Sequence, residues 1–166
     1  MRIKKVNQHL KVTLLGLFTV GLCNISLANH HKDTKMSSDK DKVANVVQVM
    51  TEAFHKKDMH NIMASYEKGA AIMFEPGVAI SDPEMIEKMF EGAFQINPEF
   101  TYPNGHEVYI ANDIAMHIAP WIMIGKTPDG TDIEQKGLSV AILRKQENGD
   151  WLMVLDNPNS QALMNQ

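Results

Sequence analysis

The second half of the chain is a series of strand-like segments with turn residues between them, and this pattern constrains the fold more than any other feature. After Pro98 no helical periodicity remains. The strand-like segments cover 106–111, 114–125, 132–146 and 151–156. The turn residues between them are Asn112-Asp113, Pro128-Asp129-Gly130 and Asn148-Gly149. Because Asn-Gly is the strongest short hairpin signal, the sequence predicts an antiparallel meander.

The first half of the chain carries apolar residues at helical spacing instead. Three amphipathic helices are predicted. The first starts near Ser38 or Asp39, the second runs from a cap at Asp58 to about Lys68, and the third opens at 81–84, where a Ser and a Glu three residues on form a capping box. Their apolar faces are Val43, Val46, Val47, Met50 and Phe54; Met59, Ile62, Met63 and Tyr66; and Met85, Ile86, Met89, Phe90, Ala93 and Phe94.

Between the second and third helices, the short apolar run 70–75 is stopped by Pro76-Gly77 and predicts a strand. The order of elements is therefore an α+β layout with helices on one side of a sheet. Four long strands covered by three helices are expected to curl, so we expect a cone-shaped curved antiparallel sheet wrapped around three N-terminal helices. A hollow lined by Met, Ile, Phe and Trp would lie inside.

The first 28 residues differ from the rest, because they carry four basic residues and no acidic one. A basic start, an apolar run over 12–22 and Ser26-Leu27-Ala28 predict a secretory signal peptide cleaved near Ala28, hence a periplasmic or secreted protein. The run is shorter than the roughly 20 residues of a spanning helix, so no permanent membrane anchor is predicted. Cys23 leaves lipidation open, although bulky Leu22 precedes it.

The remaining chain is expected to consist of a flexible leader over 29–40 and one domain over 41–166. All 20 acidic residues lie there, which argues against a nucleic-acid partner. Cys23 is the only cysteine, so the exported part would have neither disulfides nor thiol catalysis. No metal-ligand pattern and no phosphate-binding glycine loop occurs, and no metal or cofactor is predicted.

Three stretches resemble the nuclear transport factor 2-like superfamily. They are VVQVMTEAFHKKDMHNIMASYEKGAAIMFEPGV (46–78), the helix SDPEMIEKMFEGAF and the hairpin end GDWLMVLDNPNS. The SnoaL-like branch is most similar, ketosteroid isomerase is a more distant relative, and the resemblance covers about 40–162. It implies the cone fold and a homodimer formed through the sheet. The superfamily hosts isomerases, cyclases, dehydratases and pure binding domains, so the resemblance predicts the fold better than the activity.

Glu75 is the first candidate catalytic residue, because with Pro76 it stands where the isomerase relatives place an Asp-Pro whose carboxylate is the general base. A carboxylate at the mouth of an apolar hollow would have a raised pKa suited to moving protons. The alternative is a solvated residue at a strand end. The positions that match the isomerases' oxyanion donors are Met50 and Val140 or Ala141, whose side chains donate no hydrogen bond, so the isomerase mechanism is not expected intact.

His117 and Asp156 are the other catalytic candidates. His117 lies amid apolar neighbours in a strand and would share a face with Trp121; packing on the outer face or at a subunit contact is the alternative. Asp156 and Asn157 end the last strand, where they could reach the pocket or instead form a turn before Pro158.

Two functions remain open at this stage. In one, the domain binds a small, largely apolar molecule; in the other, it is an isomerase- or hydratase-like enzyme that uses Glu75 as base. The enzyme hypothesis requires Glu75 and at least one of His117 and Asp156 to point into one cavity. The residues expected to line the pocket are Met50, Phe74, Phe90, Tyr109, Trp121 and Asn157.

Overall fold

The computed structural model describes the backbone of residues 31–165, with the side chains of 39–162 and Met164. The predicted signal peptide, its cleavage site and Cys23 lie outside these residues. The helices are α1 (His31–His55), α2 (Met59–Ala64), α3 (Pro83–Ala93) and the 3-10 helices η1 (Phe94–Ile96) and η2 (Ser160–Asn165). The strands are β1 (Tyr66–Glu75), β2 (Val78–Ile80), β3 (Glu99–Thr101), β4 (Glu107–Ala111), β5 (Ile114–Lys126), β6 (Asp132–Lys145) and β7 (Trp151–Asn157).

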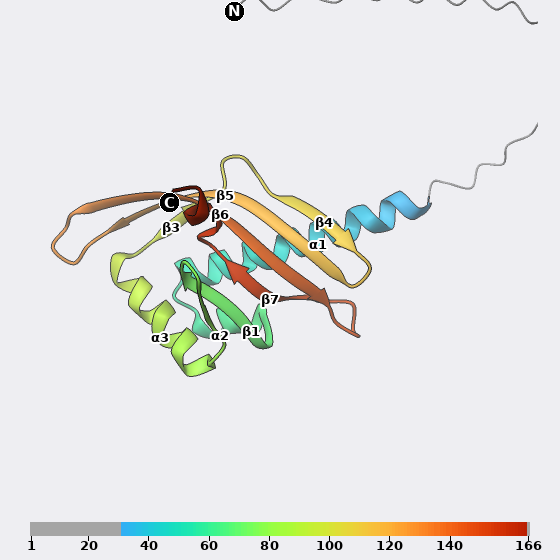
Figure 1. The fold of residues 1–166 in the computed structure, drawn as a ribbon, viewed down its shortest axis with the longest axis horizontal. Helices are drawn as coiled ribbons and strands as arrows, with labels where there is room; N and C mark the ends of the chain where they lie inside the picture. The colour runs from blue at the N-terminus through green and yellow to red at the C-terminus, as the bar shows by residue number, and fades with distance from the viewer. Residues whose placement is uncertain (1–30, 166) are drawn as a thin grey trace, which may run out of the picture.

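The strands form one curved sheet in the order β2-β1-β7-β6-β5-β3, with β4 on the same edge of β5 as β3. In Figure 1, α1 crosses the sheet and α3 lies near β1, while the β5–β6 hairpin extends past the helices. The helices and the meander therefore agree with the predicted α+β cone. Within the described residues, no helix is both long enough and apolar enough to cross a bilayer.

The sheet is mixed, whereas the sequence predicted an antiparallel one. β1 pairs with β7 in parallel, with Ile72 opposite Asp156, and every other pairing is antiparallel. The other long strands that are neighbours in the sheet follow one another through short turns, which impose antiparallel pairing. β1 reaches β7 only after α3 and the whole meander, so no turn fixes their relative direction.

Two helix boundaries also differ from the prediction. α1 begins at His31, so most of the stretch expected as a leader, 29–40, is helical. No Gly or Pro occurs between His31 and His55 to stop the helix. In addition, Lys145 Nζ lies 2.8 Å from Asp39 Oδ2, which ties this part of α1 to β6.

The second helix ends at Ala64, and β1 begins at Tyr66 rather than Ala70. Tyr66 continued the helical stripe of the sequence, but here it pairs with Met153, whose N–H donates to the Ser65 carbonyl at 3.0 Å. Tertiary pairing therefore decides the structure of this segment. The three-residue strands β2 and β3 were not predicted, because three residues are too few to show a period.

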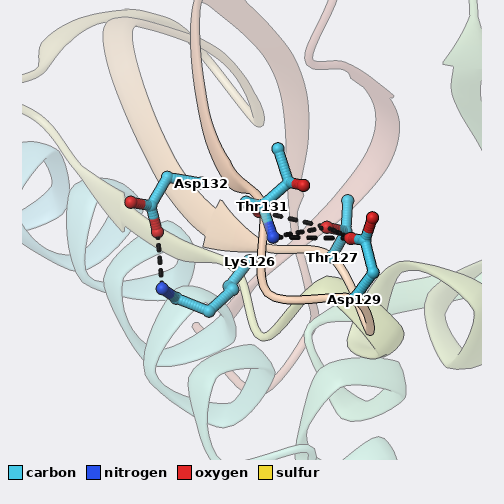
Figure 2. A network of polar contacts seen from close by, with 5 residues as sticks. All are labelled: Lys126, Thr127, Asp129, Thr131 and Asp132. Atoms are coloured by element: carbon cyan, nitrogen blue, oxygen red, sulfur yellow. Dashed lines mark hydrogen bonds and ion pairs between the residues drawn. The ribbon is translucent and has the colours of Figure 1, made fainter.

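The turn between β5 and β6 fixes their register (Figure 2). The Thr127 hydroxyl donates to the Asp129 carboxylate, and the Thr131 N–H donates to Thr127 Oγ1 at 3.0 Å. Lys126 Nζ and Asp132 Oδ1 form an ion pair of 2.7 Å across the first strand pair. From this turn, each residue of β5 has a direct partner in β6.

This register gives β5 one buried and one outer face. Its odd-numbered residues Ala115, His117, Ala119, Trp121 and Met123 are buried. The even-numbered residues are half-buried or exposed. The alternation answers the question that the sequence left open, because His117 and Trp121 face the helices.

Trp121 lies flat against Gly137, its partner in β6. A Cβ on Gly137 would stand 2.3 Å from Cζ2 of the indole, closer than any real contact. The indole Nε1 donates to the Pro158 carbonyl at 2.9 Å. Gly137 therefore gives the ring the space in which it lies.

We expect Gly137→Ala to lower the free energy of unfolding by about 1–3 kcal/mol, because the new methyl group displaces the indole. Urea denaturation measures this change. The control is Gly92→Ala in α3, where a Cβ meets open space; it should stabilise the helix by about 0.5–1 kcal/mol. A Gly137→Ala protein as stable as the parent would contradict the packing.

Candidate functional site

A cavity of about 160 Å³ lies between the helices and the inner face of the sheet. Its wall is almost entirely apolar. The lining residues are Val47, Met50, Thr51, Phe54, Tyr66, Ile72, Phe74, Phe90, Ala93, Phe100, Tyr102, Trp121, Ser139, Ala141, Met153, Asp156 and Pro158.

Aromatic rings form a connected part of this wall. Ring centroids are 5.3 Å apart for Trp121 and Phe100, 5.7 Å for Phe100 and Phe54, and 5.8 Å for Phe54 and Phe90. Phe74 adds an edge-to-face contact to Phe90 at 5.0 Å. Edge-to-face packing of this kind is favourable beyond the area it buries and holds the rings in place.

A carboxylate and a phenol meet in this apolar wall. Tyr66, the first residue of β1, donates its hydroxyl to Asp156 Oδ2 at 2.8 Å, and Asp156 is only 7% exposed. Burial raises the pKa of Asp156 to about 6, although the hydrogen bond from Tyr66 lowers it. Burial and the neighbouring carboxylate raise the pKa of Tyr66. Asp156 can therefore exchange a proton near neutral pH, while Tyr66 stays protonated.

A second polar pair lines the same cavity. Thr51 Oγ1 of α1 and the Tyr102 hydroxyl are 2.9 Å apart, and either can donate. Burial raises the pKa of Tyr102, and the charge of Asp156 raises it further. The two phenols thus surround a single ionisable carboxylate, and both are neutral donors at physiological pH.

The inner face also carries a histidine pair outside the cavity lining. His117 is fully buried, and its Nε2 lies 2.8 Å from Nδ1 of His106. Its own Nδ1 has no partner in the described part of the chain. Burial, and to a lesser extent His106, lower the pKa of His117 to about 4, so the pair is neutral at pH 7.

The strand register places His117 and Asp156 in one row across the sheet. His117 pairs with Ala141, and Ala141 pairs with Asp156. With roughly 4.8 Å between strands, their Cα atoms lie about 10 Å apart. Ala141 is the small residue between them, which leaves room on the cavity side of Asp156.

Glu75 does not join this group. It is exposed at the end of β1, next to the turn at Gly77. It is not among the lining residues, although Ile72 and Phe74 of the same strand are, and β1 carries a bulge between Ile72 and Glu75. A base for a molecule in the cavity must reach it, and the structure does not place the Glu75 side chain in the cavity wall.

Only some of the residues predicted to line the pocket do so. Met50, Phe74, Phe90 and Trp121 line the cavity. Tyr109 instead is 55% exposed on β4, where its hydroxyl donates to Glu107 at 3.0 Å.

The sequence left two roles open for Asp156 and Asn157, reaching the pocket or forming a turn, and the two residues take different ones. Asn157 Oδ1 accepts from the Asn159 N–H at 3.0 Å, the turn geometry considered for it, and Asn157 is not among the lining residues. Asp156 points to the cavity.

Sequence reasoning missed the hydroxyl groups of the site. Met50 offers no donor, but Thr51 next to it does, and Tyr66 and Tyr102 supply two more. The expectation that Met50 and Val140 or Ala141 donate no hydrogen bond stands, and the donors come from positions that the sequence did not indicate. Phe54, Phe100 and Ser139 were also not singled out. Tyr102 lies in a loop after β3, and no local period indicates where such a residue points.

No three His, Cys, Asp or Glu residues come together to hold a metal ion in the part of the chain that the structure describes. Within the described residues, the contacts of the histidine pair include no carboxylate. With two ring nitrogens alone, the histidine pair does not offer the complete set of ligands that a metal ion needs.

Asp156 and His117 should influence stability with opposite signs of pH dependence. The pKa of Asp156 rises from 3.8 to about 6 on folding, so its contribution to stability increases as the pH falls from 6 towards 4. The pKa of His117 falls from 6.5 to about 4, so its contribution is complete above pH 6.5 and is lost as the pH falls towards 4.

We therefore expect the two single variants to diverge between pH 7 and pH 4.5. Relative to the parent, Asp156→Asn should lose about 2 kcal/mol of unfolding free energy on acidification, and His117→Gln should gain about 2 kcal/mol. Urea denaturation at both pH values measures the difference. Shifts of the same sign in both variants would contradict the assignment.

Comparison with known proteins supports the fold. No family model and no curated protein matches the sequence. A nuclear transport factor 2-like superfamily protein from Salmonella enterica superposes with a TM-score of 0.67 at 11% identity, over 76% of this chain and 95% of that one.

Two further solved structures with the same fold are described with different functions. A candidate ketosteroid isomerase from Shewanella frigidimarina gives a TM-score of 0.59 at 20% identity, over 68% of this chain and 90% of that one. The association domain of C. elegans CaMKII gives 0.62 at 20% identity, over 78% of this chain and all (100%) of that one. At these identities the likeness concerns the fold alone: the chain has the nuclear transport factor 2-like fold.

Proposed function

We propose that this protein binds a small, largely apolar molecule in the cavity between its helices and its sheet. The observation that carries the proposal is an apolar, aromatic cavity with a few converging polar groups, Asp156, Tyr66, Thr51 and Tyr102. This combination is typical of small-molecule sites, where apolar area supplies affinity and a few polar atoms set orientation.

The size of the cavity limits the ligand. An engineered apolar cavity of about 150 Å³ binds benzene. The cavity here, about 160 Å³, therefore suits a molecule built on one ring. The hydroxyls and the carboxyl group favour a ligand that carries one polar substituent.

A second function, proton transfer on the bound molecule, is favoured by one observation. Asp156 has a pKa of about 6 and lies in hydrogen-bond contact with Tyr66. A general acid or base works best with a pKa near the working pH. Asp156 thus replaces Glu75 as the proposed base of an isomerase- or hydratase-like reaction.

The place of action and the oligomeric state are also proposals. The signal-like residues 1–28 support export to the periplasm or beyond. The outer face of the sheet supports a homodimer, because Met116 pairs with Ile142 and Ile118 with Val140 there, so apolar side chains lie side by side. An apolar outer face is normally packed against a further layer of protein, and a second subunit would provide that layer.

Ligand binding is tested with benzyl alcohol, a one-ring neutral probe, by titration calorimetry. The parent should bind saturably. Ala93→Phe, which fills the cavity from the end of α3, should weaken binding about tenfold or more, since each 1.4 kcal/mol is a factor of ten. Glu75→Gln, outside the cavity, is the matched control and should bind like the parent. Equal binding by Ala93→Phe would contradict the site.

The dimer is tested with Ile118→Lys. A charge in the centre of the apolar outer face cannot be desolvated without a partner, so the variant should sediment as a monomer while the parent sediments as a dimer. Lys136→Gln, at the exposed far end of the same face, is the control and should remain dimeric. A monomeric parent would contradict the proposal.

A further inference from the structure

The cavity contains a carboxylate without a counter-charge. Asp156 is the one acidic residue in the lining, and the lining, all of it described by the structure, includes no Lys, Arg or His. Its hydrogen-bond partner is the neutral hydroxyl of Tyr66. Buried charges in proteins are normally paired, and an unpaired one lowers stability. A ligand with a positive charge would supply the missing counter-charge of Asp156.

The aromatic wall suits a cation as well. Trp121, Phe100, Phe54 and Phe90 follow one another at ring distances of 5.3–5.8 Å, and Tyr66 lies 6.3 Å from Phe90. The faces of such rings carry partial negative charge and attract ammonium groups, most strongly where water is excluded. The electrostatic field of an apolar cavity with a carboxylate and several aromatic rings thus favours a positively charged ligand.

We propose that the cavity selects a small organic ammonium ion carried on one apolar ring, with Asp156 as its counter-ion. This inference rests on the proposed function and specifies the ligand class. Asp156 is already desolvated by the fold, so binding requires only the ammonium group to leave water. The Tyr66 hydroxyl holds one carboxylate oxygen and leaves the other, Oδ1, without a hydrogen bond from the protein in the described residues.

No other charged group competes for the ammonium ion at Asp156. From β1 and the loop after β3 it faces the phenols of Tyr66 and Tyr102, which stay neutral. From α1 it faces Thr51, and from β6 Ser139 and Ala141, none of which titrates. The nearest titratable groups in its cross-strand row are His117 and its partner His106, whose pKa values are both lowered by burial.

The charge state of Asp156 then makes binding depend on pH. An ammonium ion pairs with the ionised carboxylate. With a pKa of about 6, the ionised fraction falls about tenfold between pH 7 and pH 5. The affinity for an ammonium ligand should fall by the same factor, whereas a neutral ligand of the same shape should not follow this trend.

The experiment compares benzylammonium, protonated throughout this range, with benzyl alcohol, at pH 7 and pH 5, by titration calorimetry. In the parent at pH 7, benzylammonium should bind at least about tenfold more tightly than benzyl alcohol, and this affinity ratio is the quantity compared. This ratio should fall about tenfold at pH 5. In Asp156→Asn it should fall to about one at both pH values, while Glu75→Gln should reproduce the parent ratio at both.

Each outcome decides a different point. Equal binding of the two probes overturns the ammonium preference and leaves the proposed function intact. Failure of both probes to bind overturns the proposed function and this inference with it. An ammonium preference that survives in Asp156→Asn overturns the role of Asp156. If Asp156→Asn does not fold, the parent decides alone: a ratio that is the same at pH 5 and pH 7 overturns the inference, and a tenfold fall supports it.

Discussion

The register between β5 and β6 is the constraint on which the site depends. Each residue from Ile114 to Lys126 faces a fixed partner, and the side chains alternate strictly between the two faces. This alternation turns His117 and Trp121 inward and sets Ala141 beside His117, and the β6–β7 pairing then places Asp156 on the other side of Ala141. Small residues of β6, Ser139 and Ala141, lie beside large ones in the cavity lining.

The fold could be read from the sequence because its signals are local. The turns at Asn112-Asp113 and Asn148-Gly149 set the meander, and Pro83 in the first turn set the start of α3, although the N-cap is Asp82 and not the Ser81 of the predicted capping box. The parallel pairing of β1 with β7 could not be read, since it joins segments about 80 residues apart and no turn residue records it. Tyr66 was misplaced for the same reason, because its pairing with Met153 outweighs its helical spacing.

The site was predicted in part, and the difference follows from how side chains are positioned. Trp121 sits on a strand whose alternation can be counted, and both Trp121 and Phe74 reach the cavity. Glu75 was proposed from likeness to a motif, but it is exposed and outside the cavity lining, and a bulge in β1 between Ile72 and Glu75 prevents its direction from being counted by alternation. Tyr102 depends on the path of a loop, and its contact with Thr51 spans two elements that no sequence period connects. The loop and the parallel strand together supply the polar chemistry of the cavity.

The turn at Thr127 to Thr131 limits how this protein can diverge. Because it closes the longest strand pair, adding two residues there would only lengthen the hairpin, and every inward side chain would keep its direction. Adding one residue would keep these directions if the loop or a bulge absorbed it. Homologous chains that keep an aromatic cavity should therefore lengthen these two paired strands by even steps and confine odd changes to the loop between them.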